Sequence, residues 1–230
     1  MDAVVPAAGL GTRLLPLTRA VPKELLPLDG RPVVQHVVDE LFAAGIERVC
    51  LVTRREKAAI EVHFADDPRV VAVRQPAPRG LGDALLCTED FVGGRPFVVA
   101  LGDCVYRTPA VVRALLAAGP SAVAVERVGP ERLSHYGVVA VEGSRVVAVI
   151  EKPAAGEAPS DLAIAGRYLL APEVFGVLRG CPPDASGELG LSQALARLER
   201  IVAVEASERR YDIGNLEAYT EAFLAFARDR

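Results

Sequence analysis

Tryptophan is absent from the 230-residue chain, and Phe, Tyr and Trp together make up only 5% of it. So few aromatic side chains offer no stacking platform for single-stranded nucleic acid. An excess of basic residues is missing as well, because 26 Lys and Arg stand against 30 Asp and Glu. The composition therefore argues against a nucleic-acid-binding protein, and its 51% of hydrophobic residues suits an ordinary folded domain.

Cysteine pairs, histidine clusters and long apolar runs are lacking too. The four cysteines are widely scattered without a CxxC pair, and the three histidines show no metal-ligand spacing. We therefore expect free thiols in a reducing cytosol and no zinc site. No apolar run approaches the roughly 20 residues of a membrane span, and the N-terminus carries no signal-peptide pattern. The sequence predicts a cytoplasmic protein that binds neither nucleic acid nor membranes.

The first half of the chain alternates short Val-rich runs with helical patterns. The runs are nearly continuous in apolar residues, as in strands covered on both faces, and they span residues 2–6, 48–53, 70–74, 97–102 and 122–127. Apolar residues at helical spacing lie between them, over residues 33–44, 57–65, 83–91 and 109–118. This repetition of strand and helix predicts a mostly parallel sheet with right-handed crossovers.

The pattern changes near residue 134. Residues 136–141 and 145–150 flank Glu142-Gly143-Ser144, which predicts a hairpin with a three-residue connection. Further strands are expected at 163–170 and 201–206, and further helices at 173–178, 189–198 and 216–227. We predict one domain over residues 1–230, a Rossmann-like three-layer α/β sandwich whose mostly parallel mixed sheet carries a β-hairpin in its second half. In such sheets the ligand lies at the carboxyl ends of the strands.

A glycine-containing loop, Ala7-Ala8-Gly9-Leu10-Gly11-Thr12-Arg13, directly follows the first predicted strand. Its two glycines let backbone N–H groups approach a polyphosphate, and Arg13 adds a permanently charged donor fork. Lys23, after Pro22, presents a second cation further on. The loop lacks the third glycine of a dinucleotide fingerprint, since Leu14 stands there, and it lacks the Gly-Lys-Ser/Thr of a Walker A loop. On the glycines alone, a tight structural turn is an equal alternative.

Two carboxylates are candidates for binding a metal ion. Asp103 ends the apolar run of residues 97–102, where it would face the ligand crevice, and Asp212 stands just before the last predicted helix. Mg²⁺ prefers oxygen ligands and usually keeps several waters, so two carboxylates with phosphate oxygens would suffice. A helix or turn cap is the alternative role for Asp103.

Longer strings extend the loop into a recognisable signature. The chain resembles the sugar nucleotidyltransferase family in three strings: Pro6-Ala7-Ala8-Gly9-Leu10-Gly11-Thr12-Arg13, Leu15-Pro16-Leu17-Thr18 and Val21-Pro22-Lys23-Glu24-Leu25-Leu26-Pro27-Leu28. The Pro-Lys-Glu form looks most like the bacterial UTP–glucose-1-phosphate uridylyltransferases of that family. Further matches follow in the family's order and cover almost the whole chain: Arg74-Gln75, Gly80-Leu81-Gly82, Leu101-Gly102-Asp103, Tyr136-Gly137, Glu151-Lys152-Pro153, Ala163-Ile164-Ala165-Gly166-Arg167-Tyr168, Gly187-Glu188-Leu189 and Tyr211-Asp212-Ile213-Gly214.

The resemblance implies an enzyme that makes UDP-glucose and pyrophosphate from UTP and glucose 1-phosphate, with Mg²⁺ as cofactor. It divides the chain into a nucleotide-binding half, about residues 1–130, and a sugar-phosphate-binding half, about residues 131–230. The implied nucleotide-binding residues are Ala7, Ala8, Gly9, Gly11, Thr12, Arg13, Gln75 and Gly80. The implied sugar-phosphate-binding residues are Gly137, Glu151, Lys152, Gly166 and Glu188. The metal would be held by Asp103 and Asp212, and the catalytic cations would be Arg13, Lys23 and Lys152.

The implied reaction is a direct displacement. A phosphate oxygen of the sugar phosphate attacks the α-phosphorus of UTP in line and pyrophosphate leaves, with no covalent enzyme intermediate. Catalysis then consists of positioning and charge neutralisation. The amide of Gln75 offers the donor and the acceptor that a uracil edge requires. On residue type alone, Lys152 would instead be a solvated strand end.

Three positions depart from the family's pattern. Cys104 replaces the usual second acid after Asp103, Asp83 stands where a histidine is common, and Ser192-Gln193 replaces a Thr-Asp pair. These departures leave the phosphate-handling residues untouched, although they bear on sugar selectivity and subunit contacts.

Two alternative functions stay open at this point. The same chemistry with dTTP or another sugar 1-phosphate is the first, because a single methyl group separates thymine from uracil. A non-catalytic, nucleotide-sensing homologue is the second, and the retention of Arg13, Lys23 and Asp103 argues against it. The predicted helix at 216–227 either packs on its own domain or makes a contact in a homo-oligomer.

Overall fold

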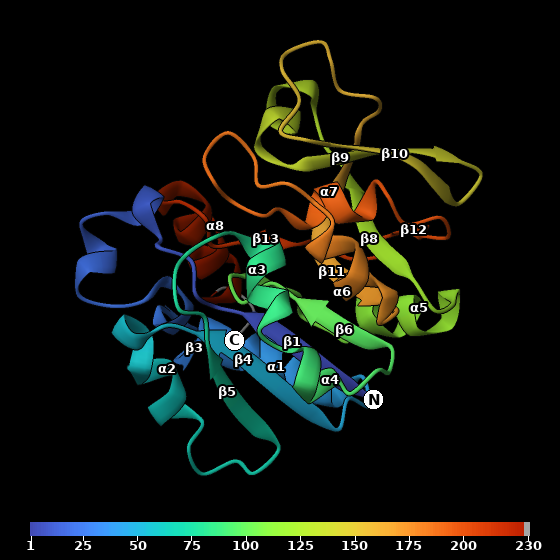
Figure 1. The fold of residues 1–230 in the computed structure, drawn as a ribbon. Coiled ribbons are helices and arrows are strands. Elements are labelled where there is room, and N and C mark those ends of the chain that lie inside the picture. Colours follow the sequence, from blue (N-terminus) through green and yellow to red (C-terminus); the bar gives the residue numbers. More distant parts are fainter. Residues whose placement is uncertain (228–230) are drawn as a thin grey trace.

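A nine-stranded mixed sheet runs through the protein in the computed structural model, which describes residues 1–227 (Figure 1). Its strands, in their order across the sheet, are β5 (Val70–Arg74), β4 (Arg48–Thr53), β1 (Asp2–Pro6), β6 (Phe97–Ala100), β11 (Leu162–Leu170), β8 (Ala122–Arg127), β12 (Val202–Glu205), β10 (Arg145–Glu151) and β9 (Gly137–Glu142). Within this sheet β11 and β10 run opposite to the other strands. The predicted α/β fold with a mixed sheet is confirmed.

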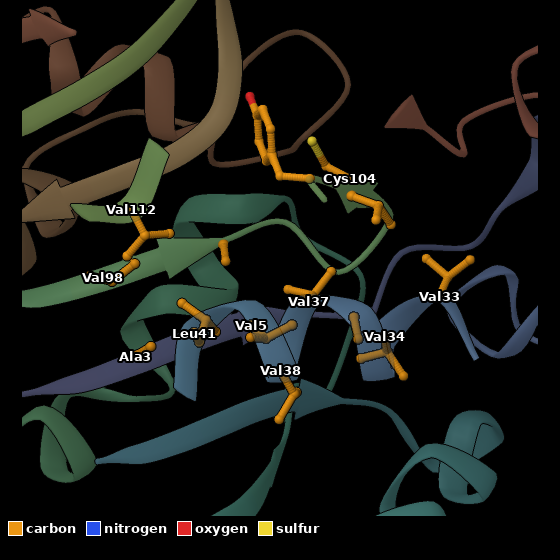
Figure 2. Packing of buried hydrophobic residues seen from close by; sticks show 14 of the residues in the cluster. Ala3, Val5, Val33, Val34, Val37, Val38, Leu41, Val98, Cys104 and Val112 are labelled. Atoms are coloured by element: carbon orange, nitrogen blue, oxygen red, sulfur yellow. The ribbon is translucent and has the colours of Figure 1, made fainter. Parts of the chain in front are cut away.

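Helices cover both faces of the sheet (Figure 1). On one face lie α1 (Val33–Ala43), α2 (Ala58–His63), α5 (Ala110–Ala118) and α8 (Leu216–Ala227). On the other lie α3 (Leu81–Leu86), α4 (Glu89–Val92), α6 (Glu173–Arg179) and α7 (Leu191–Leu195). Since side chains of a strand alternate between faces, Ala3 and Val5 of β1 join the first core and Val4 joins the second. Figure 2 shows part of the first core, in which Val37 and Leu41 of α1 pack against β1.

Two small sheets were not foreseen from the sequence. One pairs β7 (Cys104–Val105) with β13 (Tyr211–Asp212), and the other pairs β2 (Pro27–Leu28) with β3 (Arg31–Pro32). Short 3₁₀ helices occupy the connections: η1 (Thr12–Leu14), η2 (Leu17–Arg19), η3 (Lys23–Leu25), η4 (Arg55–Lys57) and η5 (Pro130–His135). No helix within residues 1–227 is both long and apolar enough to cross a membrane.

Most predicted elements appear, and some at their expected bounds. Strands β1, β4, β5 and β8 and helix α8 begin and end where the sequence predicted. The single helix expected at 83–91 is wrong, because the chain forms α3 and α4 with Thr88 between them. The Oγ1 of Thr88 donates to the carbonyl of Leu85 at 2.7 Å, a local bond of the kind that competes with continuous helix.

Two predictions in the second half also need correction. The β9–β10 hairpin has a two-residue connection rather than three, because Glu142 pairs with Arg145 and Gly143 adopts a left-handed turn conformation at φ 62°. The helix expected at 189–198 is shorter, as α7. Its predicted first residue, Leu189, lies outside the helix: its N–H donates to the carbonyl of Arg79 at 2.7 Å, and Gly190 after it has extended backbone angles.

A buried ion pair fastens α1 to the sheet. Arg167 of β11 is fully buried, and its Nη2 and Nε donate to the Glu40 carboxylate at 2.6 and 3.1 Å. Its Nη2 also donates to the carbonyl of Cys104 at 2.7 Å. The guanidinium therefore joins α1, β7 and β11, and its charge has no access to water.

Replacing Glu40 by Gln should destabilise the protein strongly. The Arg167 charge would stay buried without a counter-ion, and breaking a buried pair in this way costs about 3–5 kcal/mol. Urea unfolding followed by circular dichroism measures the loss. The matched control is Glu221→Gln, which breaks the solvent-exposed pair between Glu221 and Arg209 and should leave the unfolding midpoint nearly unchanged. Equal unfolding midpoints for the two variants would contradict a large contribution of the buried pair to stability.

Candidate active site

The carboxyl ends of parallel strands gather several predicted residues at one edge of the sheet. Strands β5, β4, β1 and β6 are mutually parallel. The loop of residues 7–13 follows β1, Gln75 follows β5, and Asp103 comes shortly after β6. In open α/β sheets the ligand crevice lies at this edge. The fold therefore brings the predicted phosphate-binding loop of residues 7–13, the predicted base-binding residue and the predicted metal ligand to one edge of the sheet.

The loop after β1 is held open by backbone and side-chain bonds. The Ala7 N–H donates to the carbonyl of Val52 at 2.8 Å, which continues the pairing with β4. Gly11 has a left-handed φ of 66°, and Thr18 Oγ1 donates to its carbonyl at 2.8 Å. A side chain at Gly9 would meet nothing within 4 Å, so the approach to the loop at that position is open. Gly11 thus forms the turn, which the bond from Thr18 stabilises, and Gly9 leaves its backbone face unobstructed.

Four charged residues predicted for catalysis or metal binding lie together beside this loop. The Lys23 Nζ donates to Asp103 Oδ2 in an ion pair, and both side chains keep only partial solvent contact, 14% and 21%. Asp212 joins them because β13 pairs with β7 and the Ile213 N–H donates to the Asp103 carbonyl at 2.8 Å. Arg13 completes the cluster.

Gly214 allows Arg13 and Asp212 to come together. A Cβ at that position would lie 2.7 Å from Asp212 Oδ1 and 2.9 Å from Arg13 Nη2. Such contacts are too short for any side chain, so only glycine leaves room for both groups as they stand. The Tyr211-Asp212-Ile213-Gly214 string belongs to the family resemblance, and the structure supplies the physical reason for its glycine.

The electrostatics of the cluster set the charge states of its members. Burial by itself would raise the pKa of Asp103, but the Lys23 ammonium and the charge of Arg13 lower it below its usual value. Burial and the negative charge of Asp103 raise the pKa of Asp212. Burial opposes the charge of Lys23, yet the carboxylates of Asp103, Glu24 and Asp212 together raise its pKa. The raised pKa of Lys23 keeps it a cation at neutral pH, paired with the Asp103 carboxylate.

Cys104 does not take part in this cluster as an anion. Burial raises the pKa of its thiol to about 12, and the Sγ donates to the Ala165 carbonyl at 3.6 Å. It packs against Gly166, where a Cβ would lie 3.0 Å from the Cys104 Sγ. The residue that replaces the family's second acid is therefore a neutral packing group, and it places the predicted sugar-site residue Gly166 beside β7.

A buried lysine that the sequence did not single out ties two loops of the site together. Lys57 Nζ donates to the Ala7 carbonyl at 2.8 Å and to the two Glu24 carboxylate oxygens at 2.9 and 2.7 Å. Burial lowers the pKa of Lys57 and raises that of Glu24, while the attraction between the two opposes both shifts. The loop of residues 7–13 and the segment that carries Lys23 are thereby fixed to each other. In the sequence, Lys57 is marked only as a charged residue at the start of the helix predicted at residues 57–65.

The predicted base-binding residues form a second group. The Gln75 Nε2 donates to the Gly80 carbonyl at 3.1 Å and to Asp83 Oδ2 at 2.7 Å. Gly80 has a φ of 95°, and a Cβ there would lie 2.6 Å from the Leu189 carbonyl oxygen. The Gly82 N–H donates to that same carbonyl at 2.7 Å. The segment after Glu188 is therefore packed directly on the predicted base-binding loop.

Most of the predicted sugar-phosphate residues lie in or next to strands β9, β10 and β11, and Glu188 lies on the loop before α7. Ser192 Oγ donates to Glu151 Oε2 at 2.6 Å, and a Cβ at Gly137 would lie 3.0 Å from that same oxygen. Lys152 has a left-handed φ of 47°, and its Nζ lies 3.6 Å from Glu151 Oε1. Ser192, one of the departures from the family's pattern, thus orients Glu151.

Not every predicted residue is joined to the charged cluster. Lys152 and Glu188 are exposed, and within residues 1–227 no hydrogen bond or ion pair connects them to Arg13, Lys23, Asp103 or Asp212. Glu188 lies on a loop in which the Asp184 Oδ1 accepts hydrogen bonds from the N–H groups of Ser186 and Glu188. The side chains of Lys152 and Glu188 are therefore separate from the charged cluster, and the backbone of Leu189, next to Glu188, bonds to Arg79 and Gly82.

Comparison with known proteins agrees with this geometry. A model of the nucleotidyl transferase family matches residues 2–229. The chain belongs to that family. The UTP–glucose-1-phosphate uridylyltransferase of Streptococcus pneumoniae is 38% identical, with 98% of this chain and 89% of that protein covered. UTP–glucose-1-phosphate uridylyltransferase 1 of Streptococcus pyogenes is also 38% identical, with 98% and 88% covered.

Solved structures of similar proteins extend over the whole nucleotidyl transferase chain. A UDP-glucose pyrophosphorylase complexed with UDP-glucose has a TM-score of 0.91 and 33% identity, and covers 100% of this chain and 99% of its own. A UTP-bound enzyme of the same kind from Acinetobacter baumannii has a TM-score of 0.87 and 29% identity, with 100% and 94% covered. The predicted family and fold are both confirmed.

Nucleotidyl transferases generally use a divalent metal ion, and the cluster suits one. Within residues 1–227 no group of three or more His, Cys, Asp and Glu side chains is arranged as a complete metal site. Asp103, just before β7, and Asp212, in the paired strand β13, nevertheless supply oxygen donors, and a cation would offset both the burial and the repulsion from Asp103 that raise the pKa of Asp212. Two carboxylates completed by waters and substrate phosphates are a donor set that Mg²⁺ accepts.

Replacing Lys57 by Met should abolish most nucleotidyl transfer, because the ammonium that joins Ala7 to Glu24 is lost. Stability should fall too, since the Glu24 carboxylate would be buried without a partner. The double variant Lys57→Met with Glu24→Met removes both charges and should recover much of the stability without restoring the tie between the loops. Turnover should stay down by about a hundredfold in both variants. Pyrophosphate release and urea unfolding, measured in parallel, separate the two effects. Full activity in the double variant would mean that the pair only stabilises the fold.

Proposed function

We propose that this nucleotidyl transferase is a UTP–glucose-1-phosphate uridylyltransferase, which makes UDP-glucose and pyrophosphate. The observation that carries the proposal is the cluster of Arg13, Lys23, Asp103 and Asp212 at the carboxyl edge of the sheet. Relatives named UTP–glucose-1-phosphate uridylyltransferase align with 98% of this chain, which supports the choice of substrates. The four free cysteines suit the cytoplasm, the location we propose.

In this proposal UTP binds along the loop after β1. Its phosphates are held by backbone N–H groups of the open glycine loop and by the guanidinium of Arg13, that is, by Ala7, Ala8, Gly9, Gly11, Thr12 and Arg13. The uracil lies against Gln75 and Gly80. The tie through Lys57 supports this assignment, because it makes the loop rigid before the nucleotide arrives and so lowers the entropy lost on binding.

Glucose 1-phosphate occupies the other half of the crevice. The exposed ammonium of Lys152 meets its phosphate, and Glu151 and Glu188 accept hydrogen bonds from sugar hydroxyls. Gly137 and Gly166 leave room for the ring. The bond from Ser192 to Glu151 supports this arrangement, because it fixes the carboxylate that would read the sugar.

The chain's own groups then promote the displacement by position and charge. A phosphate oxygen of glucose 1-phosphate forms a bond to the α-phosphorus of UTP, the bond from the α-phosphorus to the bridging oxygen breaks, and pyrophosphate leaves. Arg13 and Lys23 neutralise charge on the triphosphate, and Lys152 orients the attacking phosphate. Asp103 and Asp212 would hold Mg²⁺, which supplies further neutralisation of phosphate oxygens when bound.

Pyrophosphate release tests this function directly. We expect release only when UTP, glucose 1-phosphate and Mg²⁺ are all present, with UTP preferred in a panel of nucleoside triphosphates and sugar phosphates. Lys23→Ala and Asp103→Ala should each lower turnover by about a hundredfold or more, because each removes a charge at the transferring phosphate. The control Asp66→Ala removes an exposed carboxylate away from the cluster and should not change turnover. Preference for dTTP, or no release from any pair, would overturn the assignment.

Selective acylation tests the role of Lys152, because the chain has three lysines only, at positions 23, 57 and 152. The side chains of Lys23 and Lys57 are 14% and 8% exposed, and that of Lys152 is 66% exposed. A limiting amount of an amine-reactive ester should therefore modify Lys152 and the N-terminal amine first. Saturating UDP-glucose should slow modification of Lys152 by about tenfold, at ten times its dissociation constant, and leave the N-terminal amine unprotected. Peptide mass spectrometry reads both sites, and equal protection of the two, or of neither, would argue against Lys152.

A further inference from the structure

The orientation of the Gln75 amide is set by two neighbours that can only accept hydrogen bonds. Gln75 is 5% exposed, and its Nε2 donates to the Gly80 carbonyl at 3.1 Å and to Asp83 Oδ2 at 2.7 Å. Both hydrogens of the amide nitrogen are therefore used. Within residues 1–227 the Gln75 Oε1 makes no hydrogen bond.

A flip of this amide would be costly. It would place Oε1 against the Asp83 carboxylate and the Gly80 carbonyl, where three oxygens would face one another without a hydrogen between them. The partners cannot move away easily either. Gly80 is held at φ 95° against the Leu189 carbonyl, and the Gln75 N–H is bonded to the Thr53 carbonyl at 2.9 Å. The backbone of Gln75 and that of its partner Gly80 are thus both held in place.

We propose that Asp83 is a positioning residue that sets base specificity, by presenting Gln75 Oε1 as a fixed acceptor to the N3–H of a uracil-type base. Uracil and thymine carry a hydrogen on N3, whereas N3 of cytosine carries a lone pair. An acceptor held opposite this atom therefore accepts a hydrogen bond from the first two bases and repels the third. Asp83 itself does not touch the base in this arrangement.

The inference deepens the proposed function and rests on it, since it concerns the base of the nucleotide that the enzyme uses. Asp83 also stands at a position where a histidine is common in the family. A histidine ring presents a donor or an acceptor according to its tautomer, whereas a carboxylate accepts only. In this chain the Asp83 carboxylate therefore allows the Gln75 amide only one orientation.

The test compares Asp83→Asn with the wild type, using kcat/KM for UTP and CTP in the pyrophosphate-release assay. Asparagine nearly keeps the volume but offers either a donor or an acceptor, so the Gln75 amide can turn and present its nitrogen to cytosine. We expect the ratio of kcat/KM for UTP to that for CTP to fall by about tenfold or more, with the change mainly in KM. The matched control Asp90→Asn, on α4, removes an exposed carboxylate and should keep the wild-type ratio.

Two further measurements make the result independent of how well one variant folds. The wild-type enzyme should discriminate strongly against 3-methyluridine triphosphate, which has a methyl group in place of the N3 hydrogen. In a Gln75→Leu background, Asp83→Asn should have no further effect on the UTP to CTP ratio, because Asp83 acts through Gln75. A purely structural role for Asp83 would instead lower turnover with both nucleotides equally.

The outcomes separate this inference from the function beneath it. An unchanged ratio in Asp83→Asn, or efficient use of 3-methyluridine triphosphate by an enzyme that uses UTP, overturns the inference alone. Preference of the wild type for CTP overturns both the inference and the choice of UTP. Absence of pyrophosphate release with every nucleotide overturns the proposed function itself.

Discussion

The bond network of one buried ammonium holds the site in shape. Lys57 Nζ has three hydrogens, and they go to the Ala7 carbonyl and the two oxygens of Glu24. A buried charge is tolerated only when its partners are present, so the two loops that provide those partners cannot move apart without leaving it unpaired. Lys23 is the residue before Glu24, and this tie therefore also decides where its ammonium meets Asp103.

The sheet supplies the second constraint. Parallel strands β5, β4, β1 and β6 bring the nucleotide side to their common carboxyl edge, while the antiparallel β11 and the β9–β10 hairpin carry the predicted sugar side. The two sides are joined where the backbone of Leu189 bonds to Arg79 and Gly82. The loop that carries Glu188 is thereby bonded through its backbone to the loop that carries Gly80, so the two predicted binding loops are held in one place relative to each other.

Much of this arrangement could be predicted from the sequence, for definite physical reasons. A buried strand such as β1 needs a continuous apolar run, and the loops after such strands carry polar residues, so the positions of Arg13 and Asp103 at the carboxyl edge were predictable, while Lys23 was indicated by the family resemblance. Contacts between distant segments could not be predicted. A two-residue strand such as β13 has no periodicity, and its pairing with β7 depends on the whole fold. Lys57 was missed because a lysine at a helix start is usually a solvated residue. The break between α3 and α4 depends on one local bond of Thr88, which competes with a good helical pattern.

The use of lysine in this chain follows from the same physics. Only three of the 26 Lys and Arg residues are lysines, and the others are all arginines. A guanidinium is a planar fork, whereas an ammonium is a compact point charge with three donors. At Lys57 those donors fit three oxygens in a buried space, and at Lys23 the compact charge pairs with Asp103. An arginine at either place would bring a larger, planar group into a space that now holds a compact ammonium and its oxygen partners, so these two positions favour lysine although the chain uses arginine almost everywhere else.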